Sequence, residues 1–232
     1  MRIVTSWSDY PSAILGYNER ALIHWLRSVI REGETWLDIG GHYGYTAMAM
    51  AQRVGYAGRV FTFEPTLATA GCLSRTIGLN CLEQVTVLPL ALGYSESLHM
   101  NRTAVVRGMS DNTVKAGDEE TTILVASFDW LWPRICGGNR RIDGVKIDVQ
   151  GAEINVLQGM ERSLKECKPK LALELHQGVD RRALLQILES CGYDCEATPI
   201  EPAAGETSAQ YLDNHSYEFR PRSARATPTS FR

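Results

Sequence analysis

The sequence predicts an α/β protein built on a parallel β-sheet. Short apolar runs alternate with stretches of helical periodicity three times between residues 36 and 92, as in consecutive βαβ units. The first run ends in an acid and a glycine turn, and later runs also end in polar residues. Parallel strands deliver such residues to one edge of a sheet, where open α/β proteins bind ligands.

The first half of the chain alternates helix and strand. Apolar residues at helical spacing predict a helix over 18–31, which Asn18 caps and Gly33 ends. The elements expected next are a strand over 36–39, a helix over 45–54, a strand over 60–63, a helix over 67–79 and a strand over 85–92. Pro89 bends the last of these strands, because proline has no N–H to donate.

The second half is less regular at first. Strands are expected over 97–102 and 121–127, with a polar loop over 108–112 between them and a short helix over 128–134 that Ser127 caps. The elements that follow are a strand over 145–149, a helix over 152–164, a strand over 171–175, a helix over 181–190, a strand over 193–197 and a last, antiparallel strand over 217–219.

These elements place one domain over residues 18–219. Before it lies a segment, residues 1–17, whose Trp7, Tyr10 and Tyr17 either form an aromatic lid over the site or pack on the sheet. After it lies a tail, residues 220–232, which has four arginines and no acids and is expected to be disordered.

Composition and charge exclude several classes of protein. The net charge is −3, so there is no basic excess of the kind that marks a nucleic-acid binder. No apolar run approaches the roughly 20 residues of a membrane span, and the N-terminus lacks the apolar region of a signal peptide. We therefore expect a cytoplasmic protein whose six cysteines are free thiols.

Polar residues lie at the expected carboxyl ends of four strands. They are Asp38, Glu64, Asp148, Glu174 and His176. Because parallel strands end at the same edge, these side chains outline a cleft.

The first two strand ends predict a nucleotide-type cofactor. Asp38 precedes the glycine turn 40–44, whose amides are expected to point into the cleft. Glu64, held extended by Pro65, is placed to bond ribose hydroxyls. The spacing differs from G-x-G-x-x-G, which cradles a pyrophosphate, so S-adenosylmethionine is the leading candidate.

Several stretches together resemble the FkbM family of S-adenosylmethionine-dependent methyltransferases. They are WLDIGGHYG at 36–44, FEP at 63–65, ALG at 91–93, SFDWL at 127–131, VKIDVQGAE at 145–153, LQG at 157–159 and ELH at 174–176. The resemblance covers roughly residues 18–197. It departs from the family at Gly41-His42, where small residues or Asn are usual, and at Gln150, where an acid is usual.

The resemblance implies a Rossmann-like class I methyltransferase fold with a mostly parallel seven-stranded sheet and helices on both faces. It implies methyl transfer, most often to a hydroxyl of a natural product or sugar. The residues expected to contact the cofactor are Asp38, Gly40, Gly41, His42, Tyr43, Gly44, Glu64, Pro65, Ala91, Leu92 and Asp148.

The residues expected to be catalytic are Asp148, Glu174 and His176. In one mechanism His176 or Asp148 takes the acceptor proton, and Glu174 orients His176. In a second mechanism the three side chains hold Mg²⁺, which lowers the pKa of the acceptor hydroxyl. Glu153, in the first turn of a helix, is interpreted mainly as a structural residue.

Alternatives remain open at this stage. The acceptor is a small molecule, and a nitrogen acceptor is the first alternative to oxygen. A nicotinamide-dependent oxidoreductase shares the fold, although the chain lacks G-x-G-x-x-G and a Tyr-x-x-x-Lys pair. A non-catalytic cofactor-binding domain is a third interpretation. The oligomeric state is open, with a homo-oligomer among the options.

Overall fold

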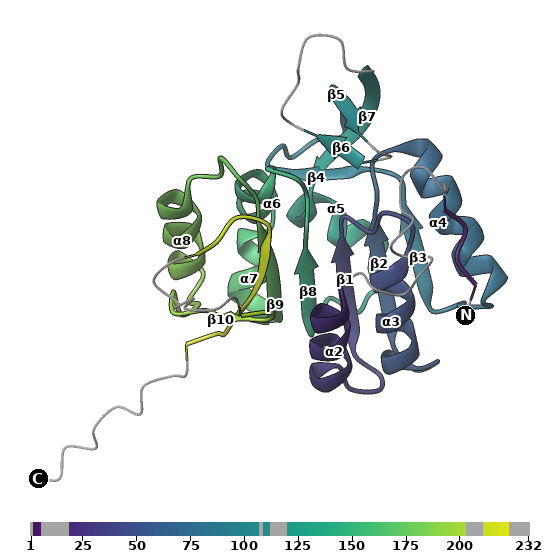
Figure 1. The fold of residues 1–232 in the computed structure, drawn as a ribbon, viewed down its shortest axis with the longest axis horizontal. Coiled ribbons are helices and arrows are strands. Elements are labelled where there is room, and N and C mark those ends of the chain that lie inside the picture. Colours follow the sequence, from purple (N-terminus) through teal and green to yellow (C-terminus); the bar gives the residue numbers. More distant parts are fainter. Residues whose placement is uncertain (1, 6–18, 107–108, 112–119, 203–210, 223–232) are drawn as a thin grey trace, which may run out of the picture.

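A computed structural model describes residues 2–5, 19–106, 109–111, 120–202 and 211–222 (Figure 1). Its main sheet has seven strands. They are β1 (Thr35–Ile39), β2 (Arg59–Phe63), β3 (Val85–Leu88), β8 (Gly144–Ile147), β9 (Lys170–Leu175), β10 (Thr198–Pro199) and β11 (His215–Phe219). Their order is β10-β11-β9-β8-β1-β2-β3. The pairs from β9 to β3 are parallel, and β11 is antiparallel to both of its neighbours, so the expected mostly parallel sheet is confirmed.

Seven helices of the described chain cover both faces of this sheet (Figure 1). They are α2 (Arg20–Val29), α3 (Tyr45–Val54), α4 (Leu67–Leu79), α5 (Phe128–Ile135), α6 (Glu153–Gly159), α7 (Glu161–Cys167) and α8 (Arg181–Ser190). Trp36 and Val60 pack with α2 and α3, whereas Leu37 and Phe61 pack in the cluster that includes α5 to α8. This alternation follows from the two-residue period of a strand.

A second sheet lies above the carboxyl ends of the parallel strands (Figure 1). It contains β4 (Ala91–Gly93), β7 (Glu120–Ser127), β5 (His99–Val106) and β6 (Met109–Asp111), in that order. The sequence predicted β5 and β7 but not β6, which falls in the stretch expected to be a polar loop. It pairs with β5, and that pairing is invisible to local sequence pattern.

Three further expectations need correction. The expected strand 85–92 divides at Pro89 into β3 and β4, and β4 pairs with β7 of the second sheet. The expected helix 152–164 divides at Met160, where α6 ends at a glycine packed against β4. The expected strand 193–197 is absent: Tyr193 forms a single bridge with Pro221 instead.

The chain ends were assigned to a lid and a tail. Trp7, Tyr10, Tyr17 and the expected cap Asn18 lie outside the described residues, so the lid stays a prediction, as does the domain boundary. Residues 2–5 run along the end of α4, where the backbone of Val4 donates to Thr76. Pro221 and Arg222 are ordered and pair with the turn after α8, so the structured part extends past Phe219.

Two other observations concern the whole described chain. All six cysteines are free, as expected. Among the residues that the structure describes, no helix has both the length and the apolar character that crossing a membrane requires.

Candidate active site

A cavity of about 510 Å³ opens at the carboxyl ends of β1, β2, β8 and β9. Residues of the second sheet, Leu92, Thr103 and Ile123, form one wall, and Glu19 before α2 lies at another side. Ten of the residues predicted to act on cofactor or acceptor line this cavity. They are Gly40, Gly41, His42, Tyr43, Glu64, Pro65, Ala91, Leu92, Asp148 and Glu174, with Gln150 from the same motif.

The glycine turn after β1 adopts a backbone that few residues tolerate. Gly40, His42 and Gly44 have φ angles of 84°, 46° and 93°. A Cβ on Gly40 would overlap the carbonyl group of Asp148, so glycine lets the turn pass close to the end of β8. His42 is not a glycine, yet its backbone is left-handed; it stands at a position where the family usually has a small residue or Asn.

The amides of this turn bind the protein itself, which corrects the expectation that they face the cofactor. Gly40 and Gly41 both donate to the carbonyl of Phe63, at 3.0 and 2.9 Å. The amide of His42 donates to the Glu64 carboxylate at 3.1 Å, and that of Gly44 to the Gly41 carbonyl at 2.8 Å. The turn is therefore fixed by the end of β2.

Glu64 is 4% exposed and borders the cavity. One carboxylate oxygen accepts from the amide of His42, and the other accepts from the amide of Thr66 at 2.9 Å. Burial raises the pKa of Glu64 to about 7, although both amide hydrogen bonds act in the opposite direction. The carboxyl group is thus held in one orientation and titrates near neutral pH.

Asp38 does not line the cavity, contrary to its expected place in the cofactor site. It is fully buried, and Thr46 donates to its carboxylate at 2.8 Å. Its other oxygen lies 3.3 Å from the ammonium of Lys146. Gly44 likewise lies outside the lining and begins α3.

Lys146 was not singled out by the sequence analysis, although a lysine inside the apolar strand β8 signals a buried charge that needs partners. Its ammonium donates to the carbonyl of Gly40 at 2.7 Å and lies 3.6 Å from Asp148. Burial alone would lower the pKa of Lys146, but the charges of Asp38 and Asp148 outweigh it and raise the pKa. Lys146 is therefore a permanent cation that ties the glycine turn to β8.

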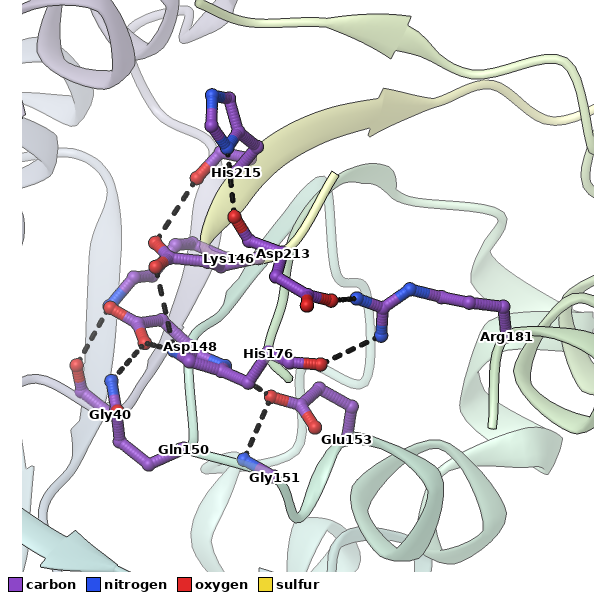
Figure 2. Close-up of polar contacts among 12 residues, drawn as sticks. Gly40, Lys146, Asp148, Gln150, Gly151, Glu153, His176, Arg181, Asp213 and His215 are labelled. Atoms are coloured by element: carbon purple, nitrogen blue, oxygen red, sulfur yellow. Dashed lines mark hydrogen bonds and ion pairs between the residues drawn. The ribbon is translucent and has the colours of Figure 1, made fainter. Parts of the chain in front are cut away.

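Asp148, Glu174 and His176 come together as the sequence predicted, and Figure 2 shows Asp148 beside His176. The His176 Nε2 atom lies 3.5 Å from Asp148 Oδ1 and 3.4 Å from Glu174 Oε1. Gln150, the second family departure, donates its amide to Asp148 Oδ1 at 3.2 Å. An acid at that position would have no such donor.

The imidazole is oriented by Glu153, not by Glu174 as expected. Glu153 is fully buried, and its Oε1 lies 2.6 Å from His176 Nδ1 (Figure 2). Burial lowers the pKa of His176, but the neighbouring carboxylates of Glu153, Glu174 and Asp148 outweigh burial and raise the pKa to about 10. In the ligand-free protein the imidazole is therefore protonated at neutral pH, which argues against its action as a free base.

The comparison with known families decides the class of protein. The sequence model of the methyltransferase FkbM domain matches residues 38–195. The chain belongs to the FkbM methyltransferase family. The family, the enzyme class and the class I fold expected from the sequence are thereby confirmed, and the protein is an S-adenosylmethionine-dependent methyltransferase.

One relative of this FkbM methyltransferase is the hexuronic acid methyltransferase AglP of Haloferax volcanii. It is 27% identical over 194 residues, which cover 78% of this chain and 72% of the relative. A solved FkbM methyltransferase from Methylobacillus flagellatus KT has a TM-score of 0.53 at 19% identity, over 89% of this chain and 52% of that one. Fibrillarin from Aeropyrum pernix, solved with natively bound S-adenosylmethionine, has a TM-score of 0.53 at 14% identity, over 86% and 73%. At identities this low, the two solved structures show that this chain shares their fold, and nothing more.

Several residues that line the cavity of the methyltransferase had no role assigned from the sequence. Glu19, which precedes α2 in a left-handed conformation, has a pKa that burial raises to about 7. Asn214, His215 and Ser216 reach the cavity from the start of β11. No local signal marks these residues, since only the pairing of β11 with β9 brings them to the carboxyl edge.

Proposed function

We propose that this methyltransferase transfers the methyl group of S-adenosylmethionine to a hydroxyl of a small molecule, either a sugar or a natural product. The observation that carries the proposal is the single cavity shared by Glu64 on one side and by Asp148 and Glu174 on the other. Strands β2 and β9 lie three positions apart in the sheet, about 14 Å at the usual strand spacing. That span accommodates a nucleoside at one end and an acceptor at the other.

The chemistry of Glu64 fits the ribose of the cofactor. Each carboxylate oxygen accepts one backbone amide and, having a second lone pair, keeps capacity for a hydroxyl donor. Pro65, Ala91 and Leu92 give the adjoining wall an apolar character suited to an adenine ring. These contacts support the sequence-based assignment of the cofactor site, except at Asp38 and Gly44, to which we assign support of the turn.

S-adenosylmethionine supplies an electrophilic methyl group carried on a sulfonium cation. The acidic residues of the cavity favour binding of a cation, since Lys146 is committed to Asp38 and Gly40. In this proposal Asp148 and Glu174 hold the acceptor hydroxyl, and its proton leaves to water. Fixing the acceptor in line with the methyl group supplies several kcal/mol of the barrier.

A sugar acceptor gains support from the relative AglP, whose name identifies a hexuronic acid as its substrate. The cytoplasmic location, the place in natural product biosynthesis and a small-molecule rather than nucleic-acid partner belong to the same proposal. The net charge of −3 supports the last of these.

The test is an acceptor screen with S-adenosylmethionine labelled in its methyl group. Uronic acids, neutral glycosides and matched amino sugars are offered separately, and the products are located by mass spectrometry and NMR. We expect O-methylated products from the hydroxyl acceptors. Products methylated only on nitrogen would contradict the proposal, and cofactor binding without turnover on any acceptor would favour the non-catalytic alternative.

A further inference from the structure

We propose that Asp148, Glu174 and His176 bind a divalent cation of the Mg²⁺ or Mn²⁺ type, to which the acceptor oxygen coordinates. The inference rests on the proposed hydroxyl acceptor and specifies how that hydroxyl is activated. One donor atom from each of the three residues lies within 4.8 Å of the others. Donors of an octahedral ion held at about 2.1 Å are about 3 Å apart, so only small side-chain shifts are required.

His176 is presented as a ligand by Glu153. The Nδ1 atom is bound to Glu153 Oε1, and the same oxygen accepts from the amide of Gly151 at 3.1 Å. A buried carboxylate on one imidazole nitrogen fixes the ring and leaves the other nitrogen for the ion, as in many metal sites. Glu153 is therefore a positioning residue that does not itself contact the cation.

The other imidazole nitrogen is aimed between two carboxylates without being bonded to either at normal length. His176 is 6% exposed, and its Nε2 lies 3.4 and 3.5 Å from Glu174 and Asp148. Hydrogen bonds from nitrogen to oxygen are usually about 2.7–3.2 Å long. Two nearly equal, long separations are the arrangement expected around a point where an ion binds.

The local charge also favours a cation. Four carboxylates gather around two basic side chains: Asp38 and Asp148 lie beside the Lys146 ammonium, and Asp148, Glu153 and Glu174 lie beside the His176 imidazole. The ammonium lies on the Asp38 side and faces Asp148 Oδ2, whereas the imidazole faces Asp148 Oδ1. A dication beside Oδ1 offsets two of the three negative charges that Lys146 leaves unbalanced.

The remaining coordination positions would face the cavity, because Asp148 and Glu174 both line it. A sugar with adjacent oxygen atoms can occupy two such positions, and a bound hydroxyl becomes more acidic. In the transfer, the acceptor O–H bond breaks and its proton is released to water. The new O–C bond forms as the S–C bond breaks, with that electron pair remaining on sulfur.

The test measures ion binding directly on the full chain after chelator treatment and removal of the chelator. Mn²⁺ is titrated and the free ion is followed by electron paramagnetic resonance. We expect one Mn²⁺ per chain, displaced by Mg²⁺. Glu174→Gln and Asp148→Asn should each weaken binding at least tenfold, whereas Glu189→Gln, which changes an exposed pair with Arg222, should leave it unchanged.

Circular dichroism and cooperative urea unfolding confirm that each variant is folded. Absence of stoichiometric Mn²⁺ binding, or binding that neither cavity variant weakens, would overturn the inference. Full turnover on a hydroxyl acceptor in the presence of chelator would also overturn it while leaving the proposed function intact. Stoichiometric Mn²⁺ binding lost in both cavity variants would support the site even if the screen yielded only N-methylated products, which would contradict the proposed function alone.

Discussion

Glu64 both fixes the glycine turn and faces the cavity, so it is the central residue of the proposed cofactor site. Its side chain illustrates what a sequence can reveal at the residue scale. An acid after the second strand and before Pro65 predicts an extended, cavity-facing carboxylate. The same reasoning failed for Asp38, because its direction depends on Thr46 and Lys146, which reach it from α3 and β8.

Glu64 predicts how cofactor affinity depends on pH. Its pKa in the free protein is about 7, and ribose hydroxyls donate to the ionised form. The affinity for S-adenosylhomocysteine, measured by calorimetry, should therefore rise between pH 6 and pH 8. Glu64→Gln should weaken binding by about 1.5–3 kcal/mol at the higher pH and flatten the dependence.

Glu19→Gln is the matched control, since Glu19 also lines the cavity with a pKa of about 7. The rise with pH should persist in this variant. If the affinity still rose with pH in Glu64→Gln but no longer did so in Glu19→Gln, the ribose contact would belong to Glu19, which would contradict the assignment to Glu64.

Lys146 predicts a large loss of stability. Lys146→Met leaves the fully buried Asp38 without its cation, which should lower the free energy of unfolding by about 3–5 kcal/mol in urea denaturation. Lys165→Met removes an exposed ion pair with Glu161 and should change the free energy of unfolding by no more than about 0.5 kcal/mol. Similar losses in both variants would mean that the buried ion pair is not structural.

At the scale of elements, local pattern was sufficient for the regular helices and insufficient where elements meet. The bounds of α3, α4 and α8 agree with those expected from sequence. The break between α6 and α7 was missed, although it falls where Gly159 packs closely against the backbone of Gly93 in β4, a neighbour far away in sequence.

Gly159 provides a test of that contact. A Cβ at this position would overlap the carbonyl oxygen of Gly93, so Gly159→Ala should destabilise the protein by about 1–3 kcal/mol. Gly71 lies within α4 with open space around it, and Gly71→Ala should stabilise by up to about 1 kcal/mol through helix propensity. Thermal and urea unfolding of both variants should change in opposite directions, and a stabilising Gly159→Ala would contradict the packing argument.

For the whole molecule, the parallel sheet was predictable because each βα unit has a recognisable pattern of apolar residues within its own sequence. The strand order and the second sheet were not, since they depend on pairings such as Ala91 with Val125. That second sheet supplies one wall of the cavity, where Thr103 and Ile123 were not predicted from the sequence. Its residues, together with Asn214 and His215, become neighbours only in the folded chain.

In the proposed function, the cofactor lies along the carboxyl edge of the parallel strands. The most direct measurement is a crystal structure of the protein with S-adenosylhomocysteine. It should show both ribose hydroxyls within hydrogen-bonding distance of the Glu64 carboxylate, and the sulfur directed toward Asp148 and Glu174. A ribose bound away from Glu64, or a sulfur directed away from those two carboxylates, would contradict it.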